Sequence, residues 1–152
     1  FTPIQLAEYC AAVANGGTRH SASILKSVRS FNYGENVYER EDEVLSKVES
    51  PQYNWDAVHE GMRLVAKDSL SSYTMTTVAA KTGTAQKGEY VTNDGIFICY
   101  APFEDPEIAI AIVVERGGAG ANCAPIAKEI LQAYFSLKSA TDVTDTEGKL
   151  LQ

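Results

Sequence analysis

The sequence predicts an α+β fold in which one antiparallel sheet is flanked by helices. Residues 96–101 and 108–115 are apolar and β-branched and are joined by a proline-containing turn, a pattern typical of a β-hairpin. Helical spacing of apolar residues appears near both ends of the chain, in residues 3–14 and 123–135. With 152 residues, of which 45% are hydrophobic and 22% charged, the chain is long enough for one domain with a buried core.

The first helix has clear signals at both ends. Thr2 is a favourable N-cap, and Pro3 suits the first helical position. The sequence Asn-Gly-Gly at residues 15–17 ends the helix, because glycine adopts the left-handed turn that often follows one. Residues 18–31 are expected to be extended. The polar, acidic residues 32–50 are expected to form a loop or a short pair of strands.

A second helix is predicted over residues 54–66 by four apolar side chains that fall on one face: Trp55, Val58, Met62 and Val65. A serine-rich connection, residues 68–73, follows this helix. Residues 77–80, with the sequence Thr-Val-Ala-Ala, then predict a strand. This strand continues into Lys-Thr-Gly-Thr at residues 81–84.

The two apolar strands are hydrophobic along almost their whole length, which predicts that helices cover both faces of the sheet. Asn122 is expected to cap the last helix. Its inward-facing side chains are predicted from their spacing to be Ile126, Ile130, Leu131, Tyr134 and Phe135. The domain is expected to comprise residues 1–138, and residues 139–152 are expected to form a polar, flexible tail.

Composition excludes several classes of function. The net charge is -7 and no helix carries a stripe of Lys or Arg, so no nucleic-acid partner is expected. The three cysteines are far apart, and neither His20 nor His59 has a metal-ligating neighbour at helical spacing, so no zinc site is expected. The cysteines are interpreted as small buried apolar residues. No segment has the roughly 20 consecutive apolar residues of a membrane span.

The Lys-Thr-Gly-Thr segment carries the chemistry of a binding site. An edge strand exposes backbone N–H groups that bind an extended peptide or stabilise a developing oxyanion. Gly83 lets a substrate lie against the backbone, because it has no side chain. Lys81 supplies a positive charge, while Thr82 and Thr84 supply hydroxyl groups for a carboxylate.

Residues 81–86, KTGTAQ, resemble the Lys-Thr-Gly motif of penicillin-binding transpeptidases. Four further segments resemble that family in the same order along the chain. They are FTPIQLAEYCAAVANGGT (1–18), AVHEGMRLV (57–65), GIFICYAPFEDPEIAIAIVVE (95–115) and CAPIAKEILQAYF (123–135). The resemblance therefore covers about residues 1–135 and does not depend on one motif alone.

This resemblance implies the C-terminal part of a serine D,D-transpeptidase domain with a β-lactamase-like fold. Such an enzyme cross-links peptidoglycan stem peptides through an acyl-enzyme and binds β-lactams, without a metal or cofactor. The family's substrate-binding residues correspond to Lys81, Thr82, Gly83 and Thr84. The Thr84 backbone N–H corresponds to half of the oxyanion hole. The parent protein is expected on the extracytoplasmic face of the bacterial membrane, anchored by an N-terminal segment.

The family's nucleophile lies in a Ser-x-x-Lys motif upstream of the segment that residues 1–18 resemble. Its Ser-x-Asn motif also lies upstream, and no Ser-x-Asn is expected anywhere in this chain. One string, Ser23 to Lys26, has the Ser-x-x-Lys spacing. It lies in a segment predicted to be extended, where residues i and i+3 point to opposite faces, so we do not interpret it as catalytic. No catalytic residue is therefore assigned in this chain.

These considerations predict a piece of a longer protein, consistent with a first residue, Phe1, that is not Met. The chain is expected to be inactive alone, to require the N-terminal part of the same protein, and to self-associate through an exposed half-domain surface. A non-covalent peptidoglycan or β-lactam binding module is the alternative function. The Gly-rich residues 116–125 lack the Gly-Lys-Ser/Thr of a phosphate-binding loop and are interpreted as a turn before a helix.

Overall fold

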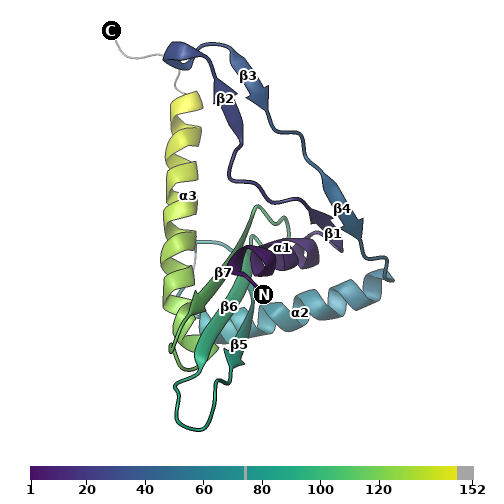
Figure 1. The fold of residues 1–152 in the computed structure, drawn as a ribbon, viewed down its shortest axis with the longest axis vertical. Helices are drawn as coiled ribbons and strands as arrows, with labels where there is room; N and C mark the ends of the chain where they lie inside the picture. Colours follow the sequence, from purple (N-terminus) through teal and green to yellow (C-terminus); the bar gives the residue numbers. More distant parts are fainter. Residues whose placement is uncertain (74, 147–152) are drawn as a thin grey trace.

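The computed structural model describes residues 1–73 and 75–146 and has an α+β architecture (Figure 1). A three-stranded antiparallel sheet has the order β5 (Ala79–Ala85), β6 (Asp94–Ala101), β7 (Ile108–Val114). The helices that flank it are α1 (Pro3–Ala14), α2 (Gln52–Ser69) and α3 (Ala124–Thr146). The predicted antiparallel sheet with flanking helices is confirmed.

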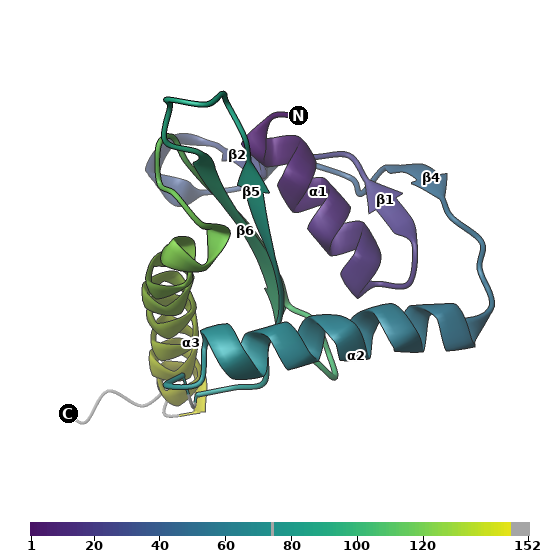
Figure 2. The ribbon, with the colours of Figure 1, turned by 90° about the horizontal axis from the view of Figure 1, so that it is seen from below.

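The central strand β6 supplies both halves of the core. Its side chains alternate, so Phe97, Cys99 and Ala101 face one side and Ile98 and Tyr100 the other. Helix α1 packs on the Ile98 side and α3 on the Phe97 side, and Figure 2 shows these two helices on opposite sides of the sheet. Helix coverage of both faces, as the apolar strands predict, is therefore confirmed.

Helix α1 begins and ends where its sequence predicts. The Thr2 Oγ1 accepts the Gln5 N–H at 3.4 Å, and the Gln5 Oε1 accepts the Thr2 N–H at 2.9 Å, which forms a capping box. After the helix, Gly17 has a φ of 109°, and a Cβ there would lie 2.4 Å from the Val48 carbonyl oxygen. Glycine is therefore required at this position by both conformation and space.

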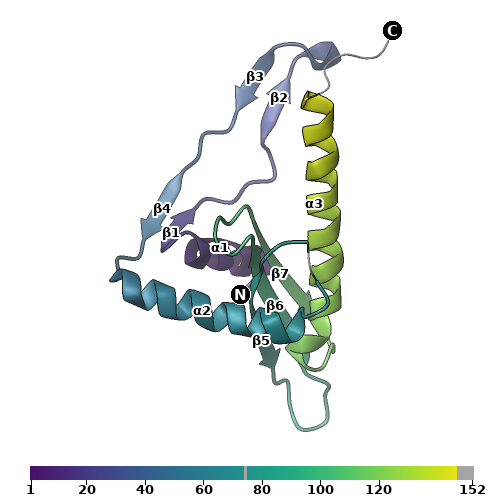
Figure 3. The ribbon, with the colours of Figure 1, turned by 180° about the vertical axis from the view of Figure 1, so that it is seen from behind.

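Residues 18–47 form a long two-stranded arm that extends away from the sheet (Figures 1 and 3). Strand β1 (Thr18–His20) pairs with β4 (Val44–Lys47), and β2 (Ser27–Arg29) pairs with β3 (Asn36–Glu39), both antiparallel. A 3₁₀ turn, η1 (Phe31–Tyr33), forms the tip. Residues 18–29 are extended, as predicted. Residues 32–50 contain two short strands, β3 and β4, but each pairs with a strand of residues 18–29 and not with the other.

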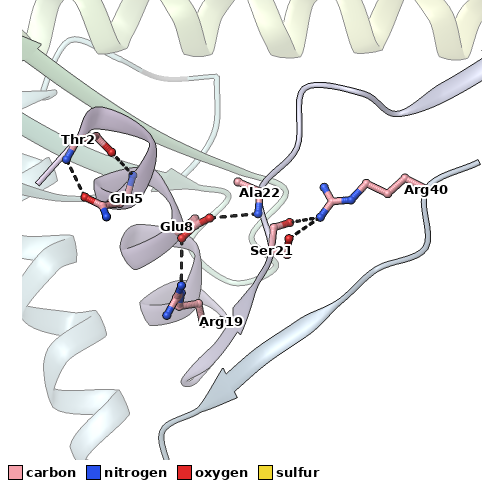
Figure 4. Close-up of polar contacts among 7 residues, drawn as sticks. All are labelled: Thr2, Gln5, Glu8, Arg19, Ser21, Ala22 and Arg40. Atoms are coloured by element: carbon pink, nitrogen blue, oxygen red, sulfur yellow. Dashed lines mark hydrogen bonds and ion pairs between the residues drawn. The ribbon is translucent and has the colours of Figure 1, made fainter.

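The arm is attached to α1 by a polar network (Figure 4). The Glu8 Oε1 accepts the Ala22 N–H at 3.1 Å, and the Glu8 Oε2 lies 3.5 Å from the Arg19 Nε. From the segment between β3 and β4, the Arg40 Nη2 donates to the Ser21 carbonyl oxygen at 2.6 Å and to the Ser21 Oγ at 2.8 Å. Residues 21–22 are thus held by both the helix and the segment that follows β3.

Replacing Glu8 with alanine is expected to loosen the base of the arm, because the Ala22 N–H loses its acceptor. Hydrogen exchange at the Ala22 amide is expected to become roughly tenfold faster, while exchange in β6 stays unchanged. The matched control is Glu60→Ala, which removes an exposed carboxylate paired with Arg63 on α2. Equal Ala22 exchange in the wild type and in Glu8→Ala would contradict this role of Glu8.

The buried faces of α2 and α3 differ from the predicted ones. In α2, Met62 is buried but Val58 is 46% exposed, because the N-terminal half of the helix extends past the sheet (Figure 2). In α3, Ile126 and Ile130 are exposed, whereas the residues that contact the sheet are Ala124, Ala127, Leu131 and Phe135. Small alanines let this helix approach the sheet closely, which turns the larger isoleucines outward.

The segment predicted as a tail, residues 139–152, begins as helix, since α3 continues to Thr146. No glycine or proline occurs between Ser139 and Thr146, so no residue there interrupts the helical hydrogen bonds. Residues 147–152 lie outside the described part of the chain. Among the described residues, no helix combines the length and apolar character that a membrane crossing requires.

Candidate active site

The four predicted substrate-binding residues lie together on β5, which is an edge strand of the described sheet. Their partners on β6 are Ile98 for Lys81, Phe97 for Thr82, Ile96 for Gly83 and Gly95 for Thr84. Because Ile98 faces α1 and Phe97 faces α3, Lys81 projects on the α1 side and the two threonines on the α3 side. The edge therefore presents a cation on one side and two hydroxyls on the other.

Lys81 is exposed, and its side chain lies along the strand. The Lys81 Nζ donates a hydrogen bond to the Thr82 carbonyl oxygen at 2.7 Å. This contact holds the ammonium group beside the backbone of the edge strand. A negatively charged group that lies along the edge would therefore meet a positive charge there.

A second element supports the strand from the α3 side. The 3₁₀ turn η2 (Gly120–Cys123) precedes α3, and the Gly120 N–H donates to the Thr84 Oγ1 at 3.2 Å. Asn122, expected to cap α3, instead donates from its side chain to the Gly117 carbonyl oxygen at 2.9 Å. The Gly-rich residues 116–125 form a turn that leads into a helix, as interpreted from the sequence.

Asp94, which the sequence prediction missed, holds together the two turns next to Thr84. It is 9% exposed; its carboxylate pairs with the Lys87 Nζ at 2.7 Å and accepts the Arg116 N–H at 2.8 Å. The hydrogen bond from Lys87, followed by that from Arg116, lowers the pKa of Asp94 below its ordinary value of 3.8. The sequence feature that could have indicated this role is the position of Asp94, an acidic residue at the start of an apolar strand.

Asp94→Asn is expected to lower the melting temperature at about pH 7, where the wild-type carboxylate is ionised. A lowered pKa in the folded state stabilises the protein above the unfolded pKa, and this stabilisation is lost as the pH falls through the folded pKa. The difference between wild type and variant is therefore expected to shrink below about pH 3.8. Thermal melts along a pH series measure this difference in melting temperature, and Asp105→Asn, at an exposed residue, is the control. A difference that grows in acid would contradict this role.

The rejected Ser23–Lys26 string lies outside any helix, as predicted. The Ser23 Oγ donates to the Leu25 carbonyl oxygen at 3.2 Å and accepts the Leu25 N–H at 3.1 Å, so its bonds are those of a local turn. The prediction that the chain contains no Ser-x-Asn is wrong, because residues 30–32 are Ser-Phe-Asn. This string lies at the tip of the arm, at the end remote from β5 (Figures 1 and 3).

The cysteines are buried in the core, which confirms their interpretation as small apolar residues. Burial raises the pKa of both Cys10 and Cys99 to about 12, so these thiols stay protonated at neutral pH. Cys123 is 1% exposed and packs beside Gly95. Within residues 1–73 and 75–146, no group of three His, Cys, Asp or Glu side chains is arranged to hold a metal ion.

Comparison with known proteins identifies similar sequences. The family model for the penicillin binding protein transpeptidase domain matches residues 1–132. Penicillin-binding protein 2A of Bacillus subtilis (strain 168) is 33% identical over 171 aligned residues, which cover 98% of this chain and 24% of that protein. Peptidoglycan D,D-transpeptidase MrdA of Haemophilus influenzae is 25% identical over 89% of this chain and 24% of its own length. The chain thus spans about a quarter of these relatives.

Solved structures match the fold as well. Penicillin-binding protein 2B from Streptococcus pneumoniae (strain R6) superposes with a TM-score of 0.80 and 25% identity, over 90% of this chain and 25% of that one. Penicillin-binding protein A from M. tuberculosis, solved as a ceftriaxone acyl-enzyme complex, gives a TM-score of 0.78 and 26% identity. That match covers 88% of this chain and 32% of the other.

Proposed function

Because the chain belongs to the penicillin-binding protein transpeptidase family, we propose that it forms one wall of a serine D,D-transpeptidase site. The substrate is a peptidoglycan stem peptide that ends in D-Ala-D-Ala, and the reaction cross-links two such peptides. Several relatives are named peptidoglycan D,D-transpeptidases, which supports this assignment. The parent protein is proposed to act at the extracytoplasmic face of the membrane.

The observation that carries the proposal is the Lys81–Thr82 contact on the edge strand. Since the Thr82 carbonyl accepts a bond from the Lys81 Nζ, this carbonyl is directed toward the open edge and away from β6. Alternate residues of an antiparallel strand direct their N–H and C=O groups to the same side. The Thr84 N–H therefore points to the open edge, as an oxyanion donor must.

The proposed residue roles follow from this geometry. The substrate lies along β5, with its terminal carboxylate near the Lys81 ammonium and the hydroxyls of Thr82 and Thr84. A serine hydroxyl attacks the amide carbonyl between the two D-alanines, and the Thr84 N–H stabilises the resulting oxyanion. The oxyanion then collapses to a serine ester, and the terminal D-alanine leaves with the proton of the serine hydroxyl on its amine. An amine from a second strand then attacks the ester and releases the serine.

The serine is proposed to come from polypeptide outside residues 1–152. Among the described residues, the one Ser-x-x-Lys string lies in the arm and not on a helix, and the hydrogen bonds of its serine hydroxyl go to the Leu25 backbone. A serine without an adjacent base is a weak nucleophile. Residues 1–152 are therefore proposed to be inactive until they pack against the upstream part of the domain.

β-Lactams are proposed to acylate the same serine. The M. tuberculosis relative is described as an acyl-enzyme with ceftriaxone, a β-lactam with a carboxylate. In this chain the Lys81 ammonium and the hydroxyls of Thr82 and Thr84, which are proposed to bind the D-Ala carboxylate, would bind the carboxylate of the β-lactam. The strained ring amide of the β-lactam would then lie where the scissile amide of the peptide lies. The carboxylate of the β-lactam would lie where the C-terminal carboxylate of the peptide lies.

The test uses a completed domain, in which residues 1–152 are joined behind the upstream part of the transpeptidase domain of the Bacillus subtilis relative. The completed domain is expected to release D-alanine from a pentapeptide ending in D-Ala-D-Ala and to transfer the acyl group to an added amine. Benzylpenicillin is expected to block both products. Reversible binding of the peptide by a folded completed domain, without D-alanine release, would favour the alternative of a non-covalent binding module.

A further inference from the structure

We propose that Gly120 is a positioning residue that orients the Thr84 hydroxyl to donate a hydrogen bond to the substrate carboxylate. This inference rests on the proposed function and adds a residue from a different element of the fold. Gly120 lies in η2, and Thr84 in β5, 36 residues earlier in the chain. Gly120 itself touches no substrate atom in this arrangement and acts through Thr84.

The turn η2 packs directly on the backbone of the sheet. A Cβ on Gly120 would lie 2.2 Å from the Gly83 carbonyl oxygen, 2.4 Å from the Ile96 carbonyl oxygen and 2.7 Å from the Gly83 nitrogen. The neighbouring Gly95 is also covered closely, because a Cβ there would lie 3.0 Å from the Cys123 Sγ. The contact between η2 and the site strand is thus one of backbone against backbone.

The direction of the Thr84 hydroxyl follows from the chemistry of its partner. A backbone N–H only donates, so the Thr84 Oγ1 must be the acceptor in its 3.2 Å bond with Gly120. The hydroxyl has one hydrogen, which this bond leaves available for a second partner. An ionised carboxylate only accepts, so it is a matched partner for that hydrogen.

The packing makes glycine necessary at this position. The atoms that a Cβ at Gly120 would meet are backbone atoms of β5 and β6, which cannot rotate away as a side chain does. Gly120→Ala must therefore displace η2 from the strand and break the bond to Thr84. Gly61 on α2 offers a matched control, because a Cβ there would meet no atom within 4 Å.

The first test measures the hydrogen bond itself in the full 152-residue chain, without any reaction. Amide exchange at Gly120 is compared in the wild type, Thr84→Ser and Thr84→Val. Serine keeps the acceptor oxygen and is expected to leave the exchange rate within about twofold, whereas valine removes the acceptor and is expected to raise the rate roughly tenfold. Equal Gly120 exchange in all three proteins would overturn the proposal.

The second test measures the consequence in the completed domain, with benzylpenicillin and its methyl ester as probes. The ester has no ionised carboxylate, so only the acid can use the oriented hydroxyl. Gly120→Ala and Thr84→Val are each expected to lower the rate of acylation by the acid roughly tenfold or more. Acylation by the ester is expected to change much less, so the ratio of acid to ester rates falls. Gly61→Ala is expected to keep the wild-type ratio.

The outcomes separate the two proposals. A folded wild-type completed domain that neither probe acylates contradicts the proposed function, while the exchange experiment still reports on the Gly120–Thr84 bond. A wild type that is acylated, with an unchanged acid-to-ester ratio in Gly120→Ala, overturns the positioning role alone. If Gly120→Ala fails to fold, the Thr84→Val and Thr84→Ser pair decides, because a positioned hydroxyl requires serine to retain the ratio and valine to lose it.

Discussion

Thr84→Pro in the completed domain is expected to lower the rate of acylation by benzylpenicillin about 10²- to 10³-fold relative to Thr84→Val. Proline has no backbone N–H, so it removes the proposed oxyanion donor of β5. Valine removes only the hydroxyl and keeps the N–H, which makes it the matched control. Stopped-flow measurement of acylation, or quenched samples analysed by mass, gives both rates.

The strand is expected to tolerate this proline because Thr84 lies on an edge strand and its N–H is directed away from β6. The residue before it is Gly83, which accommodates the restriction that proline places on its neighbour. Similar melting temperatures for the proline and valine variants check that the fold is intact. Equal acylation rates in these two variants would show that the Thr84 N–H is not an oxyanion donor.

Phe97→Ala is expected to lower the free energy of unfolding by about 3–5 kcal/mol, the usual cost of removing a fully buried phenylalanine. The Phe97 side chain is 0% exposed and lies at the centre of the core between the sheet and α3. The substitution leaves a cavity behind the strand that carries Thr82, its partner in the register. Urea denaturation of the full chain measures the change.

Phe31→Ala is the matched control for this prediction, since it makes the same chemical change at a side chain that is 92% exposed on the arm. Its expected effect is within about 0.5 kcal/mol. A Phe97→Ala protein that does not fold at all agrees with the prediction. Equal stability changes in the two variants would contradict the packing of β6 described above.

The predictions that the structure confirms depend on local sequence. The N-cap of α1 needs only Thr2 and Gln5, three residues apart, and its end needs only Gly16 and Gly17. Residues 96–101 of β6 and the whole of β7 are apolar because both faces of the sheet are covered, and the apolar run of each strand alone predicts this. The strand at residues 81–84 is local in the same way, since its four residues are consecutive in β5, whereas their role in substrate binding stays a prediction.

The features that the sequence did not reveal depend on contacts between distant segments. Ile126 and Ile130 fit a helical apolar face as well as Ala127 and Leu131 do, and only the close approach of α3 to the sheet decides between them. The roles of Asp94 and Gly120 arise from turns that meet β5 from elsewhere in the chain. Sequence periodicity carries no information about contacts between segments that are distant in the sequence.

The length of α3 shows a related limit. Polar residues after Ser136 suggested a tail, but a helix that extends beyond its core needs polar residues as well. The Ser139 Oγ donates to the Phe135 carbonyl oxygen at 2.9 Å, which adds a local bond within this part of the helix. Composition alone does not distinguish an exposed helix from an irregular tail.

The most direct test of the proposed site is the intact mass of two proteins after incubation with excess benzylpenicillin: the 152-residue chain alone and the completed domain. We predict no added mass on the chain alone and one penicilloyl group on the completed domain. Peptide mapping is predicted to locate that group on the upstream serine of the Ser-x-x-Lys motif. A stoichiometric adduct on the chain alone that Ser23→Ala abolishes would contradict the proposed site, because the nucleophile would then lie within residues 1–152.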